Sequence, residues 1–312
     1  MFEAIVVGLG KQGAKHCEAI SKIGGRVTCA VDPKLGNKTG RIVAEFDFPV
    51  FEKLDDVLES DWSCDVAVIC TPVLARKNAL LGLISAGVKR FVIEKPLAVS
   101  LEEAAWYTQQ EQKHGVKIYV NYTYRMSPPF FQARTLGLID RLELDFGYFY
   151  LGGRGSHQLW KHRISDGGGA YNEMAVHMLD LSKYLFGNSL VLQNDHRTTV
   201  RYNRNIQGVD AQVDADDVFI ASLQSSRATA IIIADFLSPV FSNCVKLTSA
   251  EEQLNLAIGK HCSRFSEVFP NYEKYDEFEN DSYARMYNLI HTGDCSGLLH
   301  TPKDTLDLFG SN

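Results

Sequence analysis

The chain has 312 residues, enough for two domains, and its 45% hydrophobic and 22% charged residues are typical of a globular protein. A net charge of −6 and scattered Lys and Arg residues argue against a general nucleic-acid-binding surface. No apolar run could span a bilayer, the first strand leaves no room for a signal peptide, and the seven cysteines are too dispersed for a metal or redox motif. We therefore expect a cytoplasmic protein with no metal site and no nucleic-acid or membrane partner.

Short apolar runs alternate with helical patterns through the first half of the chain. The expected strands are Ala4–Val7, Val27–Val31, Val66–Cys70, Arg90–Ile93 and Lys117–Val120. The expected helices are Gly13–Ile23, Leu35–Glu45, Leu54–Leu58, Ala75–Ala86 and Leu101–His114. Ser100 and Glu103 form a capping box at the start of the last of these helices. Strands that alternate with helices predict βαβ units and a parallel sheet.

A glycine-rich turn, Gly8-Leu9-Gly10-Lys11-Gln12-Gly13, joins the first strand to the first helix. Gly8 permits a tight turn, Gly10 leaves room for a pyrophosphate, and Gly13 lets the helix pack closely on the sheet. The helix N-terminus presents free N–H groups to the phosphates. Asp32 ends the second strand about twenty residues later, where a carboxylate can bind ribose hydroxyls. This context predicts a dinucleotide-binding turn, and a glycine turn without a ligand is the alternative.

Two further strands end in polar residues at the same edge of the predicted sheet. Thr71 and Pro72 follow one strand, and Glu94-Lys95-Pro96 follows the next. In a doubly wound sheet this edge binds the ligand, so charges placed there favour a functional site. A solvated pair at a strand end is the simpler alternative. The Lys95–Pro96 bond is also a candidate for a cis peptide.

The pattern changes after Val120. There, Pro128 and Pro129 end the strand and begin a helix. A strand is expected over Leu142–Leu151, and a glycine-rich loop over Gly152–Gly169. Consecutive β-rich runs without intervening helices predict a mostly antiparallel sheet, and they are Val191–Tyr202, Val218–Gln224, Thr229–Phe236 and Cys244–Thr248. The remaining expectations are a surface excursion over Gly259–Asp281, a helix over Ser282–Ile290 and one more turn over Pro302–Phe309.

An amphipathic helix is expected over Ala170–Phe186, after three consecutive glycines. Glu173, His177 and Asp180 project from one face of this helix, since they are spaced i, i+4 and i+7. An acid one turn before a histidine can orient the imidazole and set its basicity. A surface pair without function is the alternative, because Glu–His pairs at this spacing are common.

Taken in order, these motifs resemble those of the glucose-fructose oxidoreductase/inositol dehydrogenase (Gfo/Idh/MocA) family. The resemblance extends from the first strand to about residue 260. It rests on Gly8–Gly13, Asp32, Thr71-Pro72, Glu94-Lys95-Pro96, Asn121-Tyr122-Thr123-Tyr124-Arg125 and the segment Gly167 to Asp180. The glycine turn alone is unspecific, whereas Glu-Lys-Pro combined with the Gly-Gly-Gly and His-x-x-Asp helix is specific.

The resemblance implies an α/β fold with two domains. Residues 1–121 would form a Rossmann domain with a doubly wound parallel sheet. Residues 122–312 would form an α+β domain with a large, mostly antiparallel open sheet that binds substrate and forms a homodimer or homotetramer. Members of the family use NAD or NADP to oxidise or reduce a hydroxyl or ketone on a sugar, a nucleotide-linked sugar or an inositol.

The resemblance also implies roles for individual residues. Lys95 would donate a hydrogen bond to the reacting oxygen, His177 would act as general base, and Glu173 would orient His177 or hold a neighbouring hydroxyl. The expected cofactor-binding residues are Gly8, Gly10, Lys11, Gln12, Gly13, Asp32, Thr71, Pro72, Glu94 and Lys95. The candidates for the substrate wall are Tyr122, Arg125, Arg154, Trp160, Lys161, His162, Arg163 and Asp180, with ordinary packing or surface roles as the alternative for each.

The cofactor is expected to be NAD, because Asp32 places a negative charge where the extra phosphate of NADP would lie. Lys34 and Arg41 could soften this preference, so NADP remains possible. A cluster of cations beside an aromatic side chain would suit a sugar that carries a phosphate or a carboxylate.

Four positions depart from the family pattern. The family usually has Asp in place of Glu173 and Gly in place of Ala175, and it commonly has Asn and His in place of Val73 and Arg76. Two other functions occur among relatives: a glycosidase that uses NAD for a transient oxidation, and a non-catalytic NAD-binding regulator. Such regulators tend to lose the lysine or the histidine, and this chain keeps both.

Overall fold

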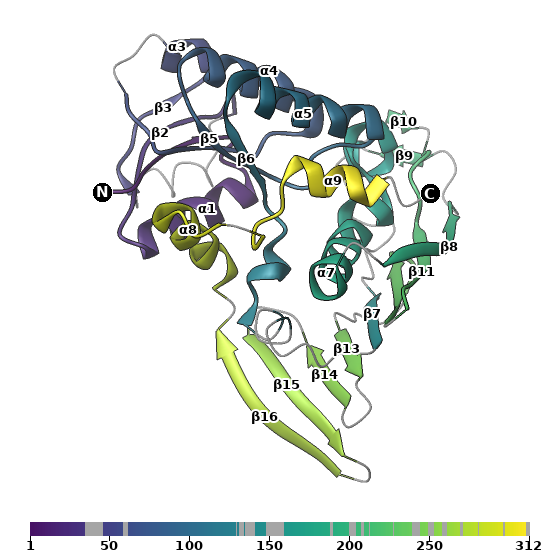
Figure 1. The fold of residues 1–312 in the computed structure, drawn as a ribbon. Helices are drawn as coiled ribbons and strands as arrows, with labels where there is room; N and C mark the ends of the chain where they lie inside the picture. The colour runs from purple at the N-terminus through teal and green to yellow at the C-terminus, as the bar shows by residue number, and fades with distance from the viewer. Residues whose placement is uncertain are drawn as a thin grey trace. The chain divides into compact units, whose positions relative to one another are not determined.

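The computed structural model describes most of the chain, in two compact units (Figure 1). The described residues are 1–34, 46–58, 62–128, 130, 134, 141–147, 159–187, 190–199, 204–206, 209–211, 213–226, 228–238, 244–248, 253–257, 261–268, 271–279, 281–295 and 297–309. The first unit comprises Met1–Thr123 and Asp281–Leu306, and the second comprises Tyr124–Asn280 and Asp307–Asn312. The expected helix over 35–45 lies outside the described residues.

The first unit contains a six-stranded parallel sheet in the order β3-β2-β1-β4-β5-β6. The strands are β1 (Glu3–Val7), β2 (Arg26–Val31), β3 (Val50–Phe51), β4 (Val66–Ile69), β5 (Arg90–Ile93) and β6 (Lys117–Val120). Nearly all residues of β1, β4 and β5 are buried, as expected for parallel strands covered on both faces. The strand order reverses between β1 and β4, which is where a doubly wound sheet binds its ligand.

The helices of this unit include the one for which a capping box was predicted. They are α1 (Lys11–Lys22), α3 (Leu54–Leu58), α4 (Val73–Ser85), α5 (Leu101–His114) and α8 (Ser282–Thr292), and α9 (Pro302–Phe309) begins in this unit. The Ser100 side chain accepts a hydrogen bond from the backbone of Glu103, so the predicted cap of α5 is confirmed. Gly115 ends α5 in the left-handed conformation, with φ of 61°.

Helix α8, near the C-terminus, belongs to the first unit, whereas all residues after 121 were expected in the second domain. Tyr287 is fully buried, and its ring lies 6.0 Å from the ring of Phe2. The ring of His291 lies 5.3 Å from Phe2 as well. These apolar contacts join the two ends of the chain, and a local sequence pattern contains no signal for them.

The second unit is built on an eight-stranded sheet in the order β16-β15-β14-β13-β7-β12-β11-β8. The strands are β7 (Arg141–Gly147), β8 (Val191–Thr198), β11 (Val218–Gln224), β12 (Thr229–Asp235), β13 (Cys244–Thr248), β14 (Gln253–Ala257), β15 (His261–Val268) and β16 (Asn271–Glu279). Only the β7–β12 pair is parallel among the paired strands of this sheet. The predicted fold class, a Rossmann sheet plus a large and mostly antiparallel sheet, is therefore confirmed.

Two strands replace the surface excursion that was expected over residues 259–281. β15 and β16 pair along their length as an antiparallel hairpin at the end of the sheet (Figure 1). The aromatic residues of β16, Tyr272, Tyr275 and Phe278, recur every third residue, so no period of two indicated a strand there. A separate two-stranded hairpin, β9 (Arg204–Ile206) and β10 (Val209–Ala211), also lies in this unit.

One face of the large sheet is covered by a helix that begins irregularly. A π-helical turn, η4 (Tyr171–Ala175), leads into α7 (Val176–Phe186), and both contact β12. Three short 3₁₀ turns, η1 (Thr123–Met126), η2 (Leu159–His162) and η3 (Ile164–Asp166), precede it in the sequence. The residues of β12 are alternately buried and half-buried, so its inner side chains pack beneath the helix.

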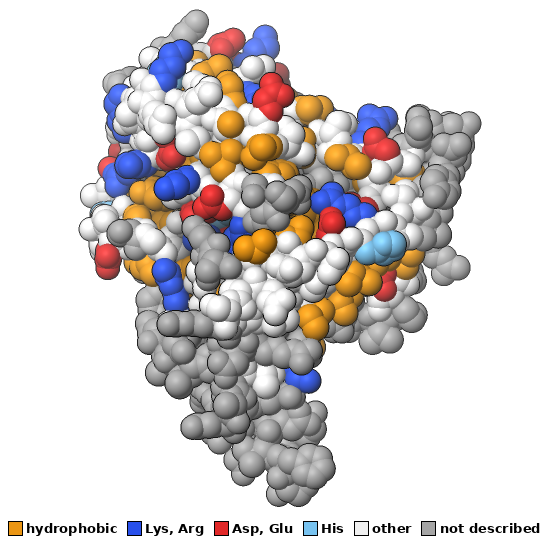
Figure 2. All heavy atoms as spheres, turned by 45° about the vertical axis from the view of Figure 1, so that its right-hand side comes forward, with side chains coloured by type: hydrophobic (Ala, Val, Ile, Leu, Met, Phe, Trp, Pro, Cys, Tyr) orange, Lys and Arg blue, Asp and Glu red, His pale blue; other side chains and the backbone are white. Residues whose placement is uncertain are grey.

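The described surface carries no block of one charge on the face drawn in Figure 2, where Lys and Arg side chains are interspersed with Asp and Glu. Within the described ranges, no helix is long and apolar enough to cross a membrane.

Candidate functional site

The glycine turn after β1 has the geometry of a phosphate-binding turn. Gly8 has φ of +97°, and a Cβ atom there would lie 3.0 Å from the carbonyl carbon of Cys70. A Cβ atom on Gly13 would lie 2.1 Å from the Gly8 oxygen, so only glycine lets α1 pack this closely on the turn. A Cβ atom on Gly10 would meet nothing within 4 Å, and no side chain caps the N-terminus of α1 there. The turn therefore leaves both space and free N–H donors for a pyrophosphate.

Two residues inside the turn differ in their surroundings. Lys11, the first residue of α1, is exposed. Gln12 accepts a hydrogen bond from the hydroxyl of Tyr283 on α8, at 3.3 Å. Gln12 therefore links the turn to α8 of the same unit.

Asp32 lies at the end of β2, beside the turn. One carboxylate oxygen accepts from the backbone N–H of Leu9 at 2.7 Å, and the other accepts from that of Lys34 at 2.8 Å. Each oxygen keeps a further lone pair for a ribose hydroxyl. Arg41, which could have softened the preference for NAD, lies outside the described residues.

Thr71 and Lys95 follow β4 and β5 at the same sheet edge. The Thr71 hydroxyl is buried and finds no hydrogen-bond partner within the described part of the chain. A buried hydroxyl without a partner is costly, so its position fits a group that binds at this edge. Lys95 is half-buried, and the Lys95–Pro96 peptide is cis.

Glu94, expected among the cofactor-binding residues, is buried in the interior of the unit. Its Oε1 lies 3.1 Å from His16 Nε2 and accepts from Asn121 Nδ2 at 2.7 Å, and its Oε2 accepts from the Lys95 backbone N–H at 3.2 Å. Burial alone would raise the pKa of this carboxyl, but the His16 and Asn121 contacts and the Lys95 charge lower the pKa to about 2. We therefore assign the Glu94 side chain to this polar network.

His16, on α1, was not singled out by sequence reasoning. Its Nδ1 lies 2.5 Å from the Tyr287 hydroxyl. With the proton on Nε2, the ring donates to Glu94 and accepts from Tyr287. His16 thus connects the cofactor-turn helix to the Glu-Lys-Pro segment and to α8, over a sequence distance that no local motif spans.

In the second unit, the three glycines at 167–169 and the acid Asp216 shape the start of η4 and α7. A Cβ atom on Gly168 would lie 2.4 Å from the Lys161 oxygen, and Gly169 has φ of +97°. Asp216 holds the first helical residues, because its carboxylate accepts from the backbone N–H of Tyr171 at 2.8 Å. Sequence reasoning missed Asp216. The acidic run Asp214-Ala215-Asp216-Asp217 between two strands is the signal that could have indicated it.

The π-helical turn changes the expected relation between Glu173 and His177. Glu173 lies within the turn, and its Oε2 accepts from Lys161 Nζ at 2.7 Å. His177 is 9% exposed, and its ring lies 4.9 Å from that of Tyr124. An extra residue in one turn rotates the side chains that follow, so the simple i, i+4 geometry does not apply. Single π-helical turns are frequent at functional sites.

Arg125 and Asp180, both candidates for the substrate wall, form a buried ion pair. Asp180 is fully buried; Arg125 Nε donates to its Oδ2 at 2.8 Å, and Arg125 Nη2 donates to its Oδ1 at 2.5 Å. Such a bidentate pair fixes both side chains. We therefore regard the pair as a support for α7.

The remaining wall candidates are dispersed. Tyr122 is buried, with its ring 4.3 Å from that of His300 in the first unit. Trp160 is 38% exposed, and the Lys161 ammonium lies 5.2 Å from the centre of its ring. His162 is buried, and Arg163 forms an ion pair with Asp166 at 3.7 Å. Arg154 lies outside the described residues.

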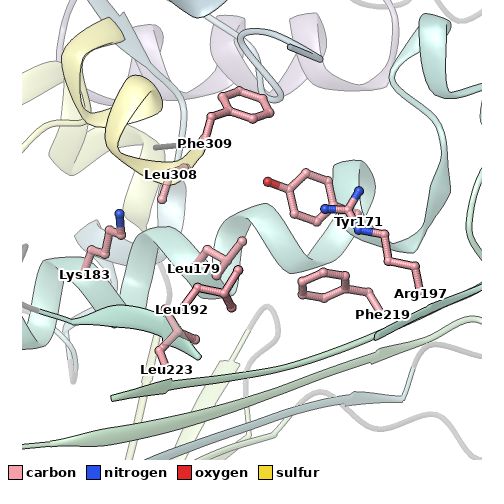
Figure 3. A pocket seen from close by; sticks show the side chains of 9 residues that line it. All are labelled: Tyr171, Leu179, Lys183, Leu192, Arg197, Phe219, Leu223, Leu308 and Phe309. Carbon is pink, nitrogen blue, oxygen red and sulfur yellow. The ribbon is translucent and has the colours of Figure 1, made fainter. Parts of the chain in front are cut away.

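A separate hollow lies within the second unit, between α7, the end of α9 and strands β8 and β11 (Figure 3). It encloses about 420 Å³, part of it open to solvent, and its lining is Tyr171, Leu179, Lys183, Leu192, Arg197, Phe219, Leu223, Leu308 and Phe309. Lys183 donates to the Asp307 carbonyl, and Arg197 lies 4.1 Å from the centre of the Tyr171 ring and pairs with Asp195. Both cations are thus engaged, and the other lining side chains are aromatic or aliphatic.

Among the described residues, no group of His, Cys, Asp or Glu side chains has the arrangement of a metal site. The first unit instead combines an open glycine turn, an anchored Asp32 and an unsatisfied Thr71 hydroxyl. These features suit a dinucleotide. In agreement with them, the profile of the oxidoreductase family with an NAD-binding Rossmann fold (GFO_IDH_MocA) matches residues 2–122.

Over these residues, the chain matches the Gfo/Idh/MocA family. Its first unit is an NAD-binding Rossmann domain. A curated relative, the scyllo-inositol 2-dehydrogenase (NAD(+)) of Bacillus subtilis, is 27% identical over 199 residues, which cover 61% of this chain and 56% of the relative. The match thus spans little more than half the length of that enzyme.

Solved structures share the fold over almost the whole chain. Levoglucosan dehydrogenase in complex with NADH and L-sorbose has a TM-score of 0.81 at 15% identity, covering 99% of this chain and 94% of that one. The 3-ketoreductase KijD10 from Actinomadura kijaniata, in complex with NADP and TDP-benzene, has a TM-score of 0.78 at 16% identity and the same coverage. One of these two solved structures with the same fold thus contains NADH, and the other contains NADP.

Proposed function

We propose that the protein is an NAD-dependent dehydrogenase or reductase that acts on a hydroxyl or ketone carbon of a neutral polyol, a free sugar or a cyclitol. The proposal is supported by the family of the first unit and by the presence of Lys95 and His177. The observation that carries the choice of a neutral substrate is the pairing of charges in the candidate substrate wall of the second unit.

Each cation of the described wall has a carboxylate partner. Lys161 pairs with Glu173 at 2.7 Å, Arg163 with Asp166 at 3.7 Å, and the buried Arg125 with Asp180. A phosphate or carboxylate on the substrate would have to compete with these carboxylates and would meet their repulsion. A neutral polyol can accept and donate hydrogen bonds at such pairs without separating charge. The paired charges therefore favour a free sugar or cyclitol over a phosphorylated or nucleotide-linked sugar.

The residues that would hold NAD are the open glycine turn, with its free N–H groups towards the pyrophosphate, and Asp32, with its lone pairs towards a ribose. When bound, the nicotinamide supplies or accepts the hydride. Lys95 donates a hydrogen bond to the substrate oxygen and stabilises the negative charge that develops there. His177 takes the hydroxyl proton during oxidation and returns it during reduction. Glu173 holds Lys161 and, through it, a hydroxyl next to the reacting carbon.

A panel of substrates tests the proposal. The protein is mixed with NAD and, separately, with scyllo-inositol, myo-inositol, free hexoses, hexose phosphates, hexuronates and nucleotide sugars, and the absorbance of reduced nicotinamide is followed. Turnover of a neutral polyol with kcat/KM at least about tenfold above its phosphorylated or carboxylated analogue is expected. A preference for the anionic analogue would contradict the assignment. Release of an aglycone without net NADH would indicate the glycosidase alternative, and tight NAD binding without turnover would indicate the regulator.

Cofactor choice is a separate prediction about Asp32. Its charge repels the additional phosphate of NADP, so we expect tighter binding of NAD. Asp32→Asn removes the charge but keeps an acceptor for the Leu9 N–H, and it should reduce the ratio of the NADP and NAD dissociation constants by about tenfold or more. Asp32→Ala should reduce it as well, with weaker binding of both cofactors because the turn loses its anchor. Titrations with NAD and with NADP measure the two dissociation constants, and Asp55→Ala is the control because Asp55 is exposed. Tighter binding of NADP than of NAD by the unaltered protein would refute the prediction.

The outer face of the large sheet supports an oligomer. Ile231 and Ile233 of β12 are half-buried on the face opposite η4 and α7, and Ile220, which is 41% exposed, lies beside Ile233 in the register. We propose that this apolar face pairs with a second copy of the chain in a homodimer or homotetramer. Light scattering that gives the mass of one chain at micromolar concentration would contradict this proposal.

A further inference from the structure

Arg76 contacts both turns at the functional edge of the first unit. It lies in the first turn of α4 and is only 5% exposed. Its Nε donates to the Thr71 carbonyl at 2.9 Å, and Nη1 donates to the carbonyl of Glu94 at 2.6 Å and to that of Pro96. Nη2 lies 3.5 Å from the Lys95 carbonyl. One guanidinium thus binds the segment after β4 and the whole Glu-Lys-Pro segment after β5.

The number and direction of these contacts explain why the residue is arginine. Buried carbonyls outside a sheet ladder need donors. A neutral histidine, the residue that the family commonly has here, offers one N–H, and lysine offers three donors from a single point. Arginine presents five donors in a rigid plane, which suits four carbonyls spread over two turns. Replacement by either residue would leave several buried carbonyls unsatisfied.

The Glu-Lys-Pro segment is also held from its other side. The Glu94 carboxylate accepts from Asn121 and from the Lys95 N–H, and it contacts His16. The carbonyls of the segment accept from Arg76. The backbone on both sides of Lys95 is therefore fixed by two buried charged groups of opposite sign, while the Lys95 side chain itself is half-buried.

We propose that Arg76 is a positioning residue for Lys95: by binding the carbonyls of residues 94 to 96 and of Thr71, it sets the direction in which the Lys95 ammonium points. The inference rests on the proposed role of Lys95 in catalysis. It assigns a function to a position at which this chain departs from its family. A misplacement of a catalytic group by about 1 Å can cost about a hundredfold in rate, so a small rotation of this segment is sufficient for a large effect.

A double-mutant cycle tests the proposal, with the polyol that gives the highest turnover in the panel as substrate. Arg76→Lys keeps the charge and loses the planar donors, and it should lower kcat by about tenfold to a hundredfold while the NAD dissociation constant changes by less than about threefold. In a Lys95→Met background the same change should alter kcat by less than about twofold, because the group that it positions is gone. A purely structural role would instead reduce kcat by the same factor in both backgrounds.

Arg90→Lys is the matched control. Arg90 begins β5 at the opposite sheet edge and likewise donates to backbone carbonyls, those of Asp65 at 2.9 Å and Ile290 at 3.1 Å. Its replacement should lower the melting temperature, as should the replacement of Arg76, but kcat should stay unchanged within about twofold. Arg76→His provides a second variant in case Arg76→Lys folds poorly, and the same cycle applies to it.

Hydrogen exchange in the protein without cofactor gives a readout independent of activity. In Arg76→Lys or Arg76→His, the amides of a peptide that covers residues 94–99 should exchange at least about fivefold faster than in the parent protein. In Arg90→Lys, the amides of the same peptide should exchange at the parent rate. Unchanged exchange, or an Arg76 variant with the parent kcat, would overturn the proposal. An active Lys95→Met enzyme would refute the proposed role of Lys95 instead, and the exchange experiment would still decide whether Arg76 holds the segment.

Discussion

Lys95→Met is expected to lower kcat by about a hundredfold to a thousandfold, the cost of removing one donor to a developing oxyanion. Methionine keeps the unbranched apolar stem of lysine as far as Cε and removes the ammonium group. Lys95 follows the buried strand β5, and its backbone is fixed by Glu94 and Arg76, so the loss should arise from the ammonium alone. The negative charge that the ammonium stabilises develops on the substrate oxygen only as the hydride moves. Loss of the ammonium should therefore lower kcat.

The affinity for NAD should change by less than about tenfold in the same variant, because the glycine turn and Asp32 remain. Fluorescence titration of NAD and steady-state kinetics with the best polyol measure the two quantities. Lys89→Met is the control, since Lys89 is an exposed lysine at the opposite end of the same strand. A folded Lys95→Met variant that no longer binds NAD would make Lys95 a cofactor ligand and would favour the regulator. Full activity would remove Lys95 from the mechanism.

The Rossmann unit could be predicted because its signals are local. Strand, glycine turn, helix and acid follow one another within Glu3–Asp32. At Gly8 and Gly13 the structure shows the steric requirement for glycine that the sequence predicted. The Glu-Lys-Pro segment was found for the same reason, as charges directly after an apolar strand. The large sheet was predicted from consecutive β-rich runs, although β15 and β16 were missed because their polar and aromatic residues gave no apolar face.

The supporting contacts could not be predicted, because they join residues that are distant in sequence. Arg76 binds carbonyls about twenty residues away, and His16 contacts Glu94 and Tyr287. The sequence analysis identified Arg76 as a departure from the family and Glu94 as a ligand-edge charge, but no periodicity indicates that the first binds the backbone of the second. The π-helical turn over Tyr171–Ala175 is equally invisible, since its residues are compatible with an ordinary helix.

His177→Ala is expected to reduce kcat by about a hundredfold or more near neutral pH, the usual scale for general acid–base catalysis. His177 lies on α7 directly after the π-helical turn, and its ring is supported by that of Tyr124 at 4.9 Å. With no base, the substrate hydroxyl must lose its proton to water or hydroxide. The deficit should therefore shrink as pH rises, since the hydroxide concentration increases tenfold with each pH unit.

The decisive measurement is the pH dependence of kcat for the neutral polyol in the parent and in His177→Ala, together with the NAD dissociation constant. His196→Ala is the control, because His196 is an exposed histidine of the same unit on β8. NAD affinity should be unchanged in both variants, since the residues that would hold the cofactor belong to the first unit. Suppose that His177→Ala turns over at the parent rate, or that its deficit is the same at every pH. Proton transfer by His177 would then be excluded, and the Lys161–Glu173 pair would be the next candidate for the proton acceptor, through the carboxylate of Glu173.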